Sequence, residues 1–260
     1  MIGLDFGFGP LQDEFFRWMF LMTRIGAALV AAPFFGMMNI PVQVRVITAG
    51  AIAVLVAAWT NTAMPAHLFS LSGLLAVAGE VLVGTVMGFV LQFAFAAPAI
   101  AAELIGSGMG LSMASTVDPQ NGAHSPALGQ YFTVVLTLVF FGLGCHLQWI
   151  ALVVKSYEVF APGHTWIGPE RIQAILSFGS VLFATAVAMA LPVTLLLLLV
   201  LVVAGVLSRS APALNLFSLG LPAAIAAGFA AMLATSPMLT DRMIELSADA
   251  IRAAARMIGA

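Results

Sequence analysis

The feature that most constrains the fold of this chain is a set of long stretches without a charged side chain. Four runs contain no Asp, Glu, Lys or Arg, and they cover residues 46–79, 119–154, 172–208 and 210–240. Each exceeds the roughly 20 residues that a helix needs to cross the apolar core of a bilayer. Membrane strands would alternate apolar and polar residues, and these runs do not. We therefore expect an all-α, polytopic membrane protein with six or seven apolar helical segments.

The composition supports this class. Of the 260 residues, 62% are hydrophobic and only 8% are charged, whereas soluble domains carry about a quarter charged residues. A net charge of −2 and sparse basic residues exclude the positive surface that nucleic-acid binding requires. The single cysteine, Cys145, excludes an intrachain disulfide and a multi-cysteine metal site. We expect it to be a small buried apolar residue.

The predicted helices follow the apolar runs. Residues before the first helix are acidic rather than basic, so we expect no cleaved signal peptide. Gly168 and Pro169 are suited to a helix start, and Pro192 should kink the helix that follows, because proline lacks a backbone donor. The predicted helices run from Phe15 to Phe35 and over 43–63, 71–97, 99–117, 127–157 and 172–207, and a last one follows SRSAP (208–212) and ends at about residue 235.

The C-terminal tail differs from the rest of the chain. Ser236 and Pro237 suit the N-cap and first position of a helix, and apolar residues then recur at helical spacing with charges between them. Acidic residues come early and arginines late, which complements the helix dipole. We expect one helical domain over residues 1–237 and, over 238–260, an amphipathic helix for an interface or a partner.

The number of membrane crossings depends on residues 99–117. If this segment crosses, there are seven crossings and the N-terminus lies outside; if it does not, there are six and the N-terminus lies inside. Both arrangements place the same number of basic residues on the cytoplasmic side, so the positive-inside rule does not separate them. Both place the C-terminus in the cytoplasm, and the side of the N-terminus stays open.

Residues 106–110 read Gly-Ser-Gly-Met-Gly, which invites two enzymatic interpretations. A phosphate-binding loop lacks its context, because no strand precedes the glycines and no Lys-Ser/Thr pair follows. An intramembrane serine protease would use Ser107 as nucleophile and His146 as base, and the glycine-flanked serine superficially resembles that of rhomboid proteases. The simpler interpretation is a backbone hydrogen bond for Ser107 and a helix contact for His146.

Arg24, Glu80 and Glu103 fall inside apolar segments, where charges are costly and tend to mark function. They suit structural ion pairs within an assembly or the proton relay of a small-solute secondary transporter. No polar cluster accompanies them, which favours pairing. Gly84 and Gly88 form a GxxxG pattern, which predicts close helix packing.

The stretch ELIGSGMGLSMASTVDPQNG (103–122) is unusually rich in small residues for this chain. Met109 and Met113 would share one face of a helix, where flexible thioethers adapt to variable partners. Asp118 and Pro119 predict its end, because the residue before proline is disfavoured in a helix. Non-helical backbone at membrane depth must lie against protein or a water-filled cavity.

Taken in order, these landmarks resemble the FliR family, the flagellar export-gate proteins whose injectisome relative is SctT. No single motif is diagnostic, but the ordered set covers nearly the whole chain. It comprises Arg24, APFFGMMNIPVQVR (32–45), GEVLVGTVMGF (79–89), AELIGSGMGLSMASTVDPQ (102–120), GCHLQWIALVVKSYEVFAPG (144–163) and ALPVTLLLLLVLVVAGVLSRSAPALNLFSLGLP (190–222). The charged tail after Pro237 is the least typical part.

The resemblance implies a structural subunit of a type III export gate in the bacterial inner membrane, at the flagellar basal body, without catalysis or cofactor. One FliR-like subunit would join several FliP and FliQ subunits in a ring that forms the entry of the secretion channel. FlhB and FlhA would be neighbours, and unfolded exported proteins the cargo. Flagellar and injectisome systems both fit. Neighbouring subunits would bury much of the apolar chain in place of lipid. Hydropathy does not distinguish the two kinds of burial, so the true number of crossings stays open.

The resemblance also implies roles for individual residues. The segment matching residues 106–122 would plug the closed pore, and its glycines would let it move. The residues expected in this plug are Gly106, Gly108, Met109, Gly110, Met113, Asp118 and Pro119. The residues expected at contacts with other subunits are Arg24, Pro33, Pro41, Arg45, Glu80, Gly84, Gly88, Glu103, His146, Arg209, Pro212 and Asn215.

Overall fold

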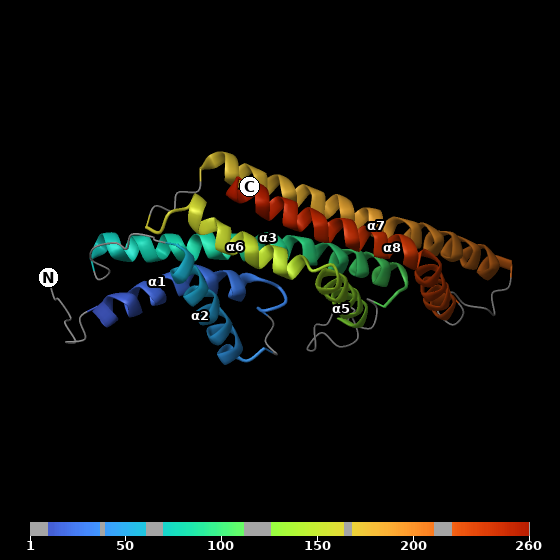
Figure 1. Ribbon diagram of the computed structural model, residues 1–260. Coiled ribbons are helices and arrows are strands. Elements are labelled where there is room, and N and C mark those ends of the chain that lie inside the picture. The colour runs from blue at the N-terminus through green and yellow to red at the C-terminus, as the bar shows by residue number, and fades with distance from the viewer. Residues whose placement is uncertain are drawn as a thin grey trace. The chain divides into compact units, whose positions relative to one another are not determined.

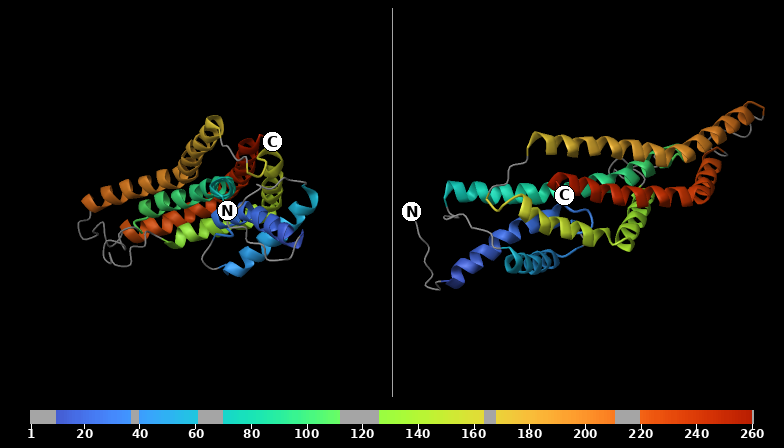
Figure 2. Two further views of the ribbon diagram at one scale, coloured as in Figure 1. Left: turned by 90° about the vertical axis from the view of Figure 1, so that its left-hand side faces the viewer. Right: turned by 45° about the horizontal axis from the view of Figure 1, so that its top comes forward.

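The computed structural model describes residues 10–36, 40–60, 70–111, 126–163, 168–210 and 220–259. Within these ranges every regular element is a helix, as the charge-free runs predict. Figure 2 shows these helices from two directions beyond that of Figure 1. They are α1 (Pro10–Ala31), α2 (Val42–Trp59), α3 (Leu71–Gly108), α5 (Pro126–Gly142), α6 (Cys145–Val159), α7 (Pro169–Ser210) and α8 (Leu221–Ile258).

Four of the described helices are long and apolar enough to cross a membrane, namely α2, α3, α7 and α8. The pair α5 and α6 makes a fifth if the two form one broken span. The first helix, α1, carries four charged residues and is not among them. The protein is therefore an all-α polytopic membrane protein, with fewer candidate spans in its described part than the sequence predicted.

The chain folds as two compact units. Unit 1 comprises residues 1–92, 145–178 and 250–260, and unit 2 comprises 93–144 and 179–249. The boundaries fall inside α3, α7 and α8 and at the turn between α5 and α6. Each unit is therefore built from segments far apart in the sequence. The predicted division into 1–237 and 238–260 stays a prediction.

α3 is one helix where the sequence predicted two. It contains Pro98 and continues to Gly108, whereas the sequence predicted helices over 71–97 and 99–117. Proline removes one backbone donor, but the buried face continues from Ala94 and Ala97 to Ala101. Tertiary packing on that face overrides the local preference for a break.

α8 likewise continues through Pro237, where the sequence predicted a new helix with Ser236 as its N-cap. Proline leaves the carbonyl of Leu233 without its usual backbone donor. The hydroxyl of Ser236 donates to that carbonyl at 2.9 Å. Serine side chains commonly satisfy backbone groups freed by proline in membrane helices, so Ser236 supports the helix instead of starting it.

Over residues 127–157 the sequence predicted one long helix, but the structure has two. α5 ends at Gly142 and α6 begins at Cys145. Gly144 between them has φ +70°, and its N–H donates to the carbonyl of Phe141 at 3.0 Å. A glycine in the left-handed region is a common way to end a helix. In the sequence, the signal for this break was the pair Gly142 and Gly144, which are separated by one residue.

The boundaries of the other helices agree more closely with prediction. α7 begins at Pro169, and the N–H groups of Arg171 and Ile172 donate to the carbonyl of Gly168 at 3.1 and 3.2 Å, which confirms the predicted start. Pro192 lies inside this helix. α1 and α2 end at Ala31 and Trp59, earlier than predicted.

Candidate functional site

In unit 1, the GxxxG pattern of α3 meets the backbone of α1. A Cβ atom added at Gly84 would lie 2.9 Å from the carbonyl carbon of Arg24 and 3.0 Å from Cβ of Ala27. One added at Gly88 would lie 2.6 Å from the carbonyl oxygen of Ala28. Real Cβ atoms essentially never approach this closely, so only glycine allows the contact. The predicted close packing is confirmed.

This approach brings together two charged side chains that the sequence had singled out. Nε of Arg24 lies 2.7 Å from Oε2 of Glu80, and Nη2 lies 3.0 Å from Oε1, which makes a bidentate ion pair. Both side chains are completely buried. The fork geometry of the guanidinium matches a carboxylate, and such pairs are among the strongest hydrogen-bonded contacts in proteins.

The end of α6 and the turn after it complete the coordination of this pair. Nη1 of Arg24 donates to the carbonyl and the hydroxyl of Ser156 at 2.8 and 3.1 Å, and Nη2 donates to the carbonyl of Phe160 at 2.8 Å. With the two bonds to Glu80, all five guanidinium N–H donors are used. The backbone N–H of Gly163 donates to Oε1 of Glu80 at 3.3 Å. The ion pair is therefore fully hydrogen-bonded.

Two buried aromatic residues of α6 reinforce the same arrangement. The hydroxyl of Tyr157 donates to the carbonyl of Leu21 at 2.5 Å, and its ring lies 4.1 Å from the guanidinium carbon of Arg24. A cation over an aromatic face is attracted electrostatically. The indole N–H of Trp149 donates to the carbonyl of Met87 at 3.2 Å. One ion pair and its neighbours thus fix α1, α3 and α6 in a single register.

α2 joins unit 1 through two side chains of α1. The indole N–H of Trp18 donates to the carbonyl of Gly50 at 3.0 Å, where the absence of a side chain admits the ring. Arg17 donates to the carbonyl of Ala57 at 3.2 Å and to that of Thr60. A cation at a helix C-terminus is favourable because the last carbonyls carry partial negative charge.

The geometry of the Arg24–Glu80 pair is that of a structural contact. Opening it would leave an unpaired charge in an apolar interior, so Glu80 is poorly suited to the proton relay of a transporter. The structure supports an ion pair over a proton relay for Arg24 and Glu80, and it places both partners in the same chain. The predicted part of these two residues in subunit assembly stays a prediction, and burial means that it would act through the shape of unit 1.

In unit 2, the first residues of the expected plug form the end of α3. Gly110 has φ +77°, its N–H donates to the carbonyl of Ser107 at 3.0 Å, and the N–H of Leu111 donates to that of Gly106 at 2.9 Å. This pair of bonds is a Schellman cap, which favours glycine in the left-handed position. Residues 106–111 thus form a capped helix end, and their expected role in a movable plug stays a prediction.

Met109 lies just before this cap and is completely buried. A Cβ atom at Gly228 of α8 would lie 2.5, 2.7 and 2.9 Å from its Cγ, Sδ and Cε atoms. The methionine side chain therefore lies along bare helix backbone. Its predicted partner on a shared helix face, Met113, lies outside the described residues.

Two other contacts hold the same end of α3. A Cβ atom at Gly108 would lie 3.2 Å from Cδ1 of Leu197 in α7, and one at Gly110 would lie 2.5 Å from Cδ1 of Leu221 in α8. Both positions are tight for any residue with a side chain. The end of α3 is thus enclosed by α7 and α8 within unit 2.

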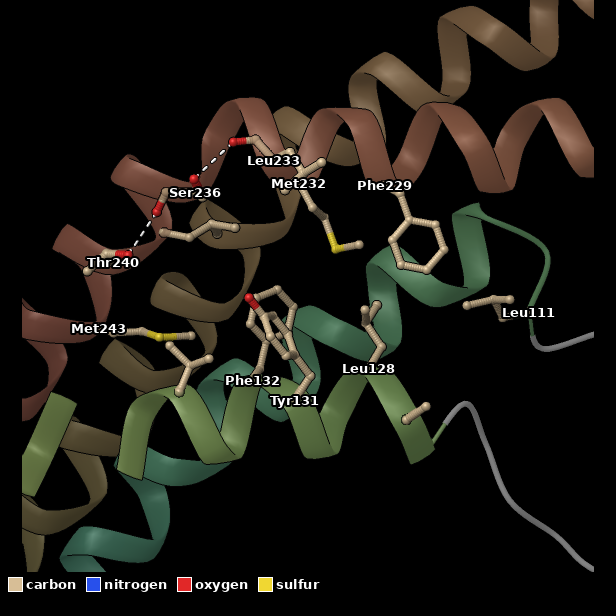
Figure 3. A pocket seen from close by; sticks show the side chains of 13 residues that line it. Leu111, Leu128, Tyr131, Phe132, Phe229, Met232, Leu233, Ser236, Thr240 and Met243 are labelled. Atoms are coloured by element: carbon tan, nitrogen blue, oxygen red, sulfur yellow. Dashed lines mark hydrogen bonds between the residues drawn. The ribbon is translucent and has the colours of Figure 1, made fainter. Parts of the chain in front are cut away.

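An apolar pocket of about 390 Å³ lies beside this helix end (Figure 3). Ser236 and Thr240 line it, but their hydroxyl groups donate to carbonyls of α8 itself. No lining residue carries a charge, so the pocket lacks the convergent polar groups of a typical catalytic site. Its other lining residues are Leu111, Ala127, Leu128, Tyr131, Phe132, Val135, Phe229, Met232, Leu233, Leu239 and Met243.

The enzymatic interpretations gain no support from the described residues. The hydroxyl of Ser107 donates to the carbonyl of Leu104 at 2.9 Å, which is the simple backbone role expected of it. His146 is half-buried near the start of α6. Within the described ranges, no group of three or more His, Cys, Asp or Glu side chains is placed to hold a metal ion.

The remaining expected residues are spread over both units. Arg45 donates to the carbonyl of Ile40 at 3.2 Å, and Pro41 is the N-cap of α2. Arg209 is exposed in the last turn of α7, where its charge suits the helix dipole. Pro33 is half-buried in the turn after α1, and Glu103 is exposed on α3. Asp118, Pro119, Pro212 and Asn215 lie outside the described residues.

The sequence did not reveal the residues that complete the Arg24–Glu80 ion pair or the contact made by Met109. Ser156, Tyr157 and Gly163 surround the ion pair, and Gly228 receives Met109. None of them carries a charge. Ser156, Tyr157 and Gly163 stand in the stretch 144–163 that resembles the family, but nothing in that stretch singled out these three residues. Their importance comes only from what packs against them.

Comparisons with known proteins agree over nearly the whole chain. The model of a family described as "Bacterial export proteins, family 1" matches residues 15–250. The flagellar biosynthetic protein FliR of Escherichia coli (strain K12) is 29% identical over 88% of each chain. FliR of Caulobacter vibrioides is 30% identical over 87% of this chain and 92% of its own. FliR of Aquifex aeolicus is 30% identical over 89% and 90%.

Proposed function

The chain belongs to family 1 of the bacterial export proteins, the FliR family, and from this premise we propose that it is a structural, pore-forming subunit of the flagellar type III export gate. The observation that carries the proposal is the family match over residues 15–250 of a polytopic helical chain. The relatives are named flagellar biosynthetic proteins, which favours the flagellar over the injectisome system.

The proposed subunit works in the bacterial inner membrane at the flagellar basal body. It assembles with FliP and FliQ into a ring at the entry of the secretion channel, with FlhB and FlhA as neighbours and unfolded exported proteins as cargo. It carries out no catalytic step and uses no cofactor. The fully hydrogen-bonded ion pair of unit 1 supports a structural role, because such a group stabilises one arrangement of helices and offers no reactive atom.

We assign the closure of the pore to residues 106–122. Its support is chemical: glycines tolerate backbone conformations that other residues resist, and methionines pack against irregular surfaces. The described part, residues 106–111, is packed within unit 2. The part that reaches the pore would therefore follow Leu111.

The test is a deletion of residues 112–117 that leaves the cap at Gly110 intact. We expect complexes that still co-purify with FliP and FliQ but have lost their barrier to small solutes in reconstituted vesicles. Export-gate complexes that assemble with this deletion and stay tight would contradict the plug. Purification of the intact chain as a stable and active protein without FliP or FliQ would contradict the gate itself.

A further inference from the structure

We propose that Gly228 of α8 is a positioning residue for the pore plug: it seats Met109 and so fixes the helix end from which the plug leaves. The proposal rests on the proposed function, because it takes residues after Leu111 to be the plug. It adds a residue on a different helix, more than 100 positions away in the sequence, as the counterpart of the plug's root.

The seat contacts the whole side chain of Met109 from Cγ outward. Three successive atoms, Cγ, Sδ and Cε, would each lie within 3.0 Å of a Cβ at Gly228. The nearest of them is Cγ, at 2.5 Å. The side chain cannot relieve that overlap by moving its flexible tip alone, because Cγ is close to the backbone. A side chain at position 228 would therefore displace the backbone of Met109 or turn its side chain out of the core.

The backbone at Met109 transmits any such displacement. Gly110, the next residue, is fixed by its left-handed conformation and by its N–H bond to the carbonyl of Ser107. Leu111 is bonded to the carbonyl of Gly106. The cap and the seat of Met109 therefore share one short piece of backbone, residues 106–111, so a shift at Met109 also shifts the cap.

The glycine itself is otherwise unexplained. Glycine weakens the interior of a helix relative to alanine, and Gly228 lies well inside α8. Two other helical glycines of unit 2, Gly129 and Gly205, have no atom within 4 Å of an added Cβ. Gly228 differs from both because its missing side chain is replaced by Met109.

The experiment compares three variants of the full chain in reconstituted gate complexes with FliP and FliQ. Gly228→Val should assemble and lose the barrier to small solutes, as deletion of residues 112–117 does. Gly228→Val with Met109→Ala should regain the barrier, because the smaller residue at 109 vacates the space that valine fills. Gly205→Val is the matched control and should stay as tight as the wild type.

The outcomes separate this proposal from the proposed function. A tight Gly228→Val complex beside a leaking deletion overturns the seat alone, whereas a deletion that does not leak overturns the plug. A double variant that leaks as much as Gly228→Val also overturns the seat, because the effect then does not pass through Met109.

A cysteine pair covers the case in which Gly228→Val fails to assemble. With Cys145 replaced by alanine, Met109→Cys and Gly228→Cys put one cysteine on each side of the seat, where Cγ of Met109 lies 2.5 Å from a Cβ built at Gly228. We expect the disulfide to form on oxidation and to leave the barrier and export unchanged. Failure to form it, or loss of export once it forms, would overturn a fixed seat.

Discussion

Unit 1 and unit 2 both bring helices unusually close, but they do so with opposite chemistry. In unit 1, Arg24 reaches Glu80 and the end of α6 through charged hydrogen bonds of 2.7 to 3.1 Å. In unit 2, Met109 lies on bare backbone at Gly228 through van der Waals contact. Charged hydrogen bonds depend on angle as well as distance, whereas thioether packing depends on available volume.

This difference decides what each unit can tolerate. The ion pair admits one arrangement of donors and acceptors, so unit 1 should be sensitive to the chemical identity of its central residues. The seat in unit 2 should accept any flexible apolar side chain of the right size and reject only a change of volume. Three sets of substitutions test the contrast.

The largest effect is expected from breaking the ion pair on one side. Arg24→Ala or Glu80→Ala leaves a buried charge without its partner and should lower the free energy of unfolding by about 3–5 kcal/mol. Denaturation in detergent micelles measures this. The double variant Arg24→Met with Glu80→Leu should cost less than either single change, because no buried charge remains. Additive losses would mean that the two residues are not coupled.

A smaller effect is expected from separating α1 and α3 without touching a charge. Gly84→Val forces a side chain against the backbone of Arg24, and overpacking of this kind costs about 1–3 kcal/mol. The control is Gly26→Ala in α1, where an added Cβ meets no atom within 4 Å. Equal stability of the two variants in the same denaturation assay would show that the close approach carries no weight.

The smallest effect is expected at Met109, and it sharpens the comparison most directly. Met109→Leu conserves volume and should cost less than about 1.5 kcal/mol. Arg24→Lys conserves charge but should cost more, because lysine lacks the fork that serves Glu80 and Ser156 together. Unfolding of both variants under one condition gives the order. A larger loss of stability for Met109→Leu than for Arg24→Lys would contradict the view that unit 1 depends on hydrogen-bond geometry and unit 2 on side-chain volume.

The sequence predicted the class of the fold better than the course of its helices. Charge-free runs require helices at membrane depth whatever their neighbours are, so the all-α class followed directly. Helix ends depended on packing and on side-chain hydrogen bonds. Ser236 satisfies the carbonyl that Pro237 leaves free, and that bond turns an expected helix start into a helix interior.

The candidate sites show the same limit at the level of residues. Arg24 and Glu80 were recognisable because charges in apolar segments are rare, but they lie 56 positions apart and nothing local pairs them. Gly84, one turn after Glu80, was the better indication of the pair, because the close packing that it predicts brings another helix within reach of Glu80. Met109 was recognisable as part of a stretch rich in small residues. Gly228 was not, because it stands among alanines that give α8 several equally small faces.

The complete hydrogen bonding of Arg24 has a consequence for the proposed place of this protein in an energised membrane. Moving a single charge across a membrane potential changes its energy by about 2.3 kcal/mol per 100 mV. Arg24 and Glu80 carry opposite charges at 2.7 Å, so the field exerts almost no net force on them. The helices of unit 1 can therefore keep their register whether the membrane is charged or discharged.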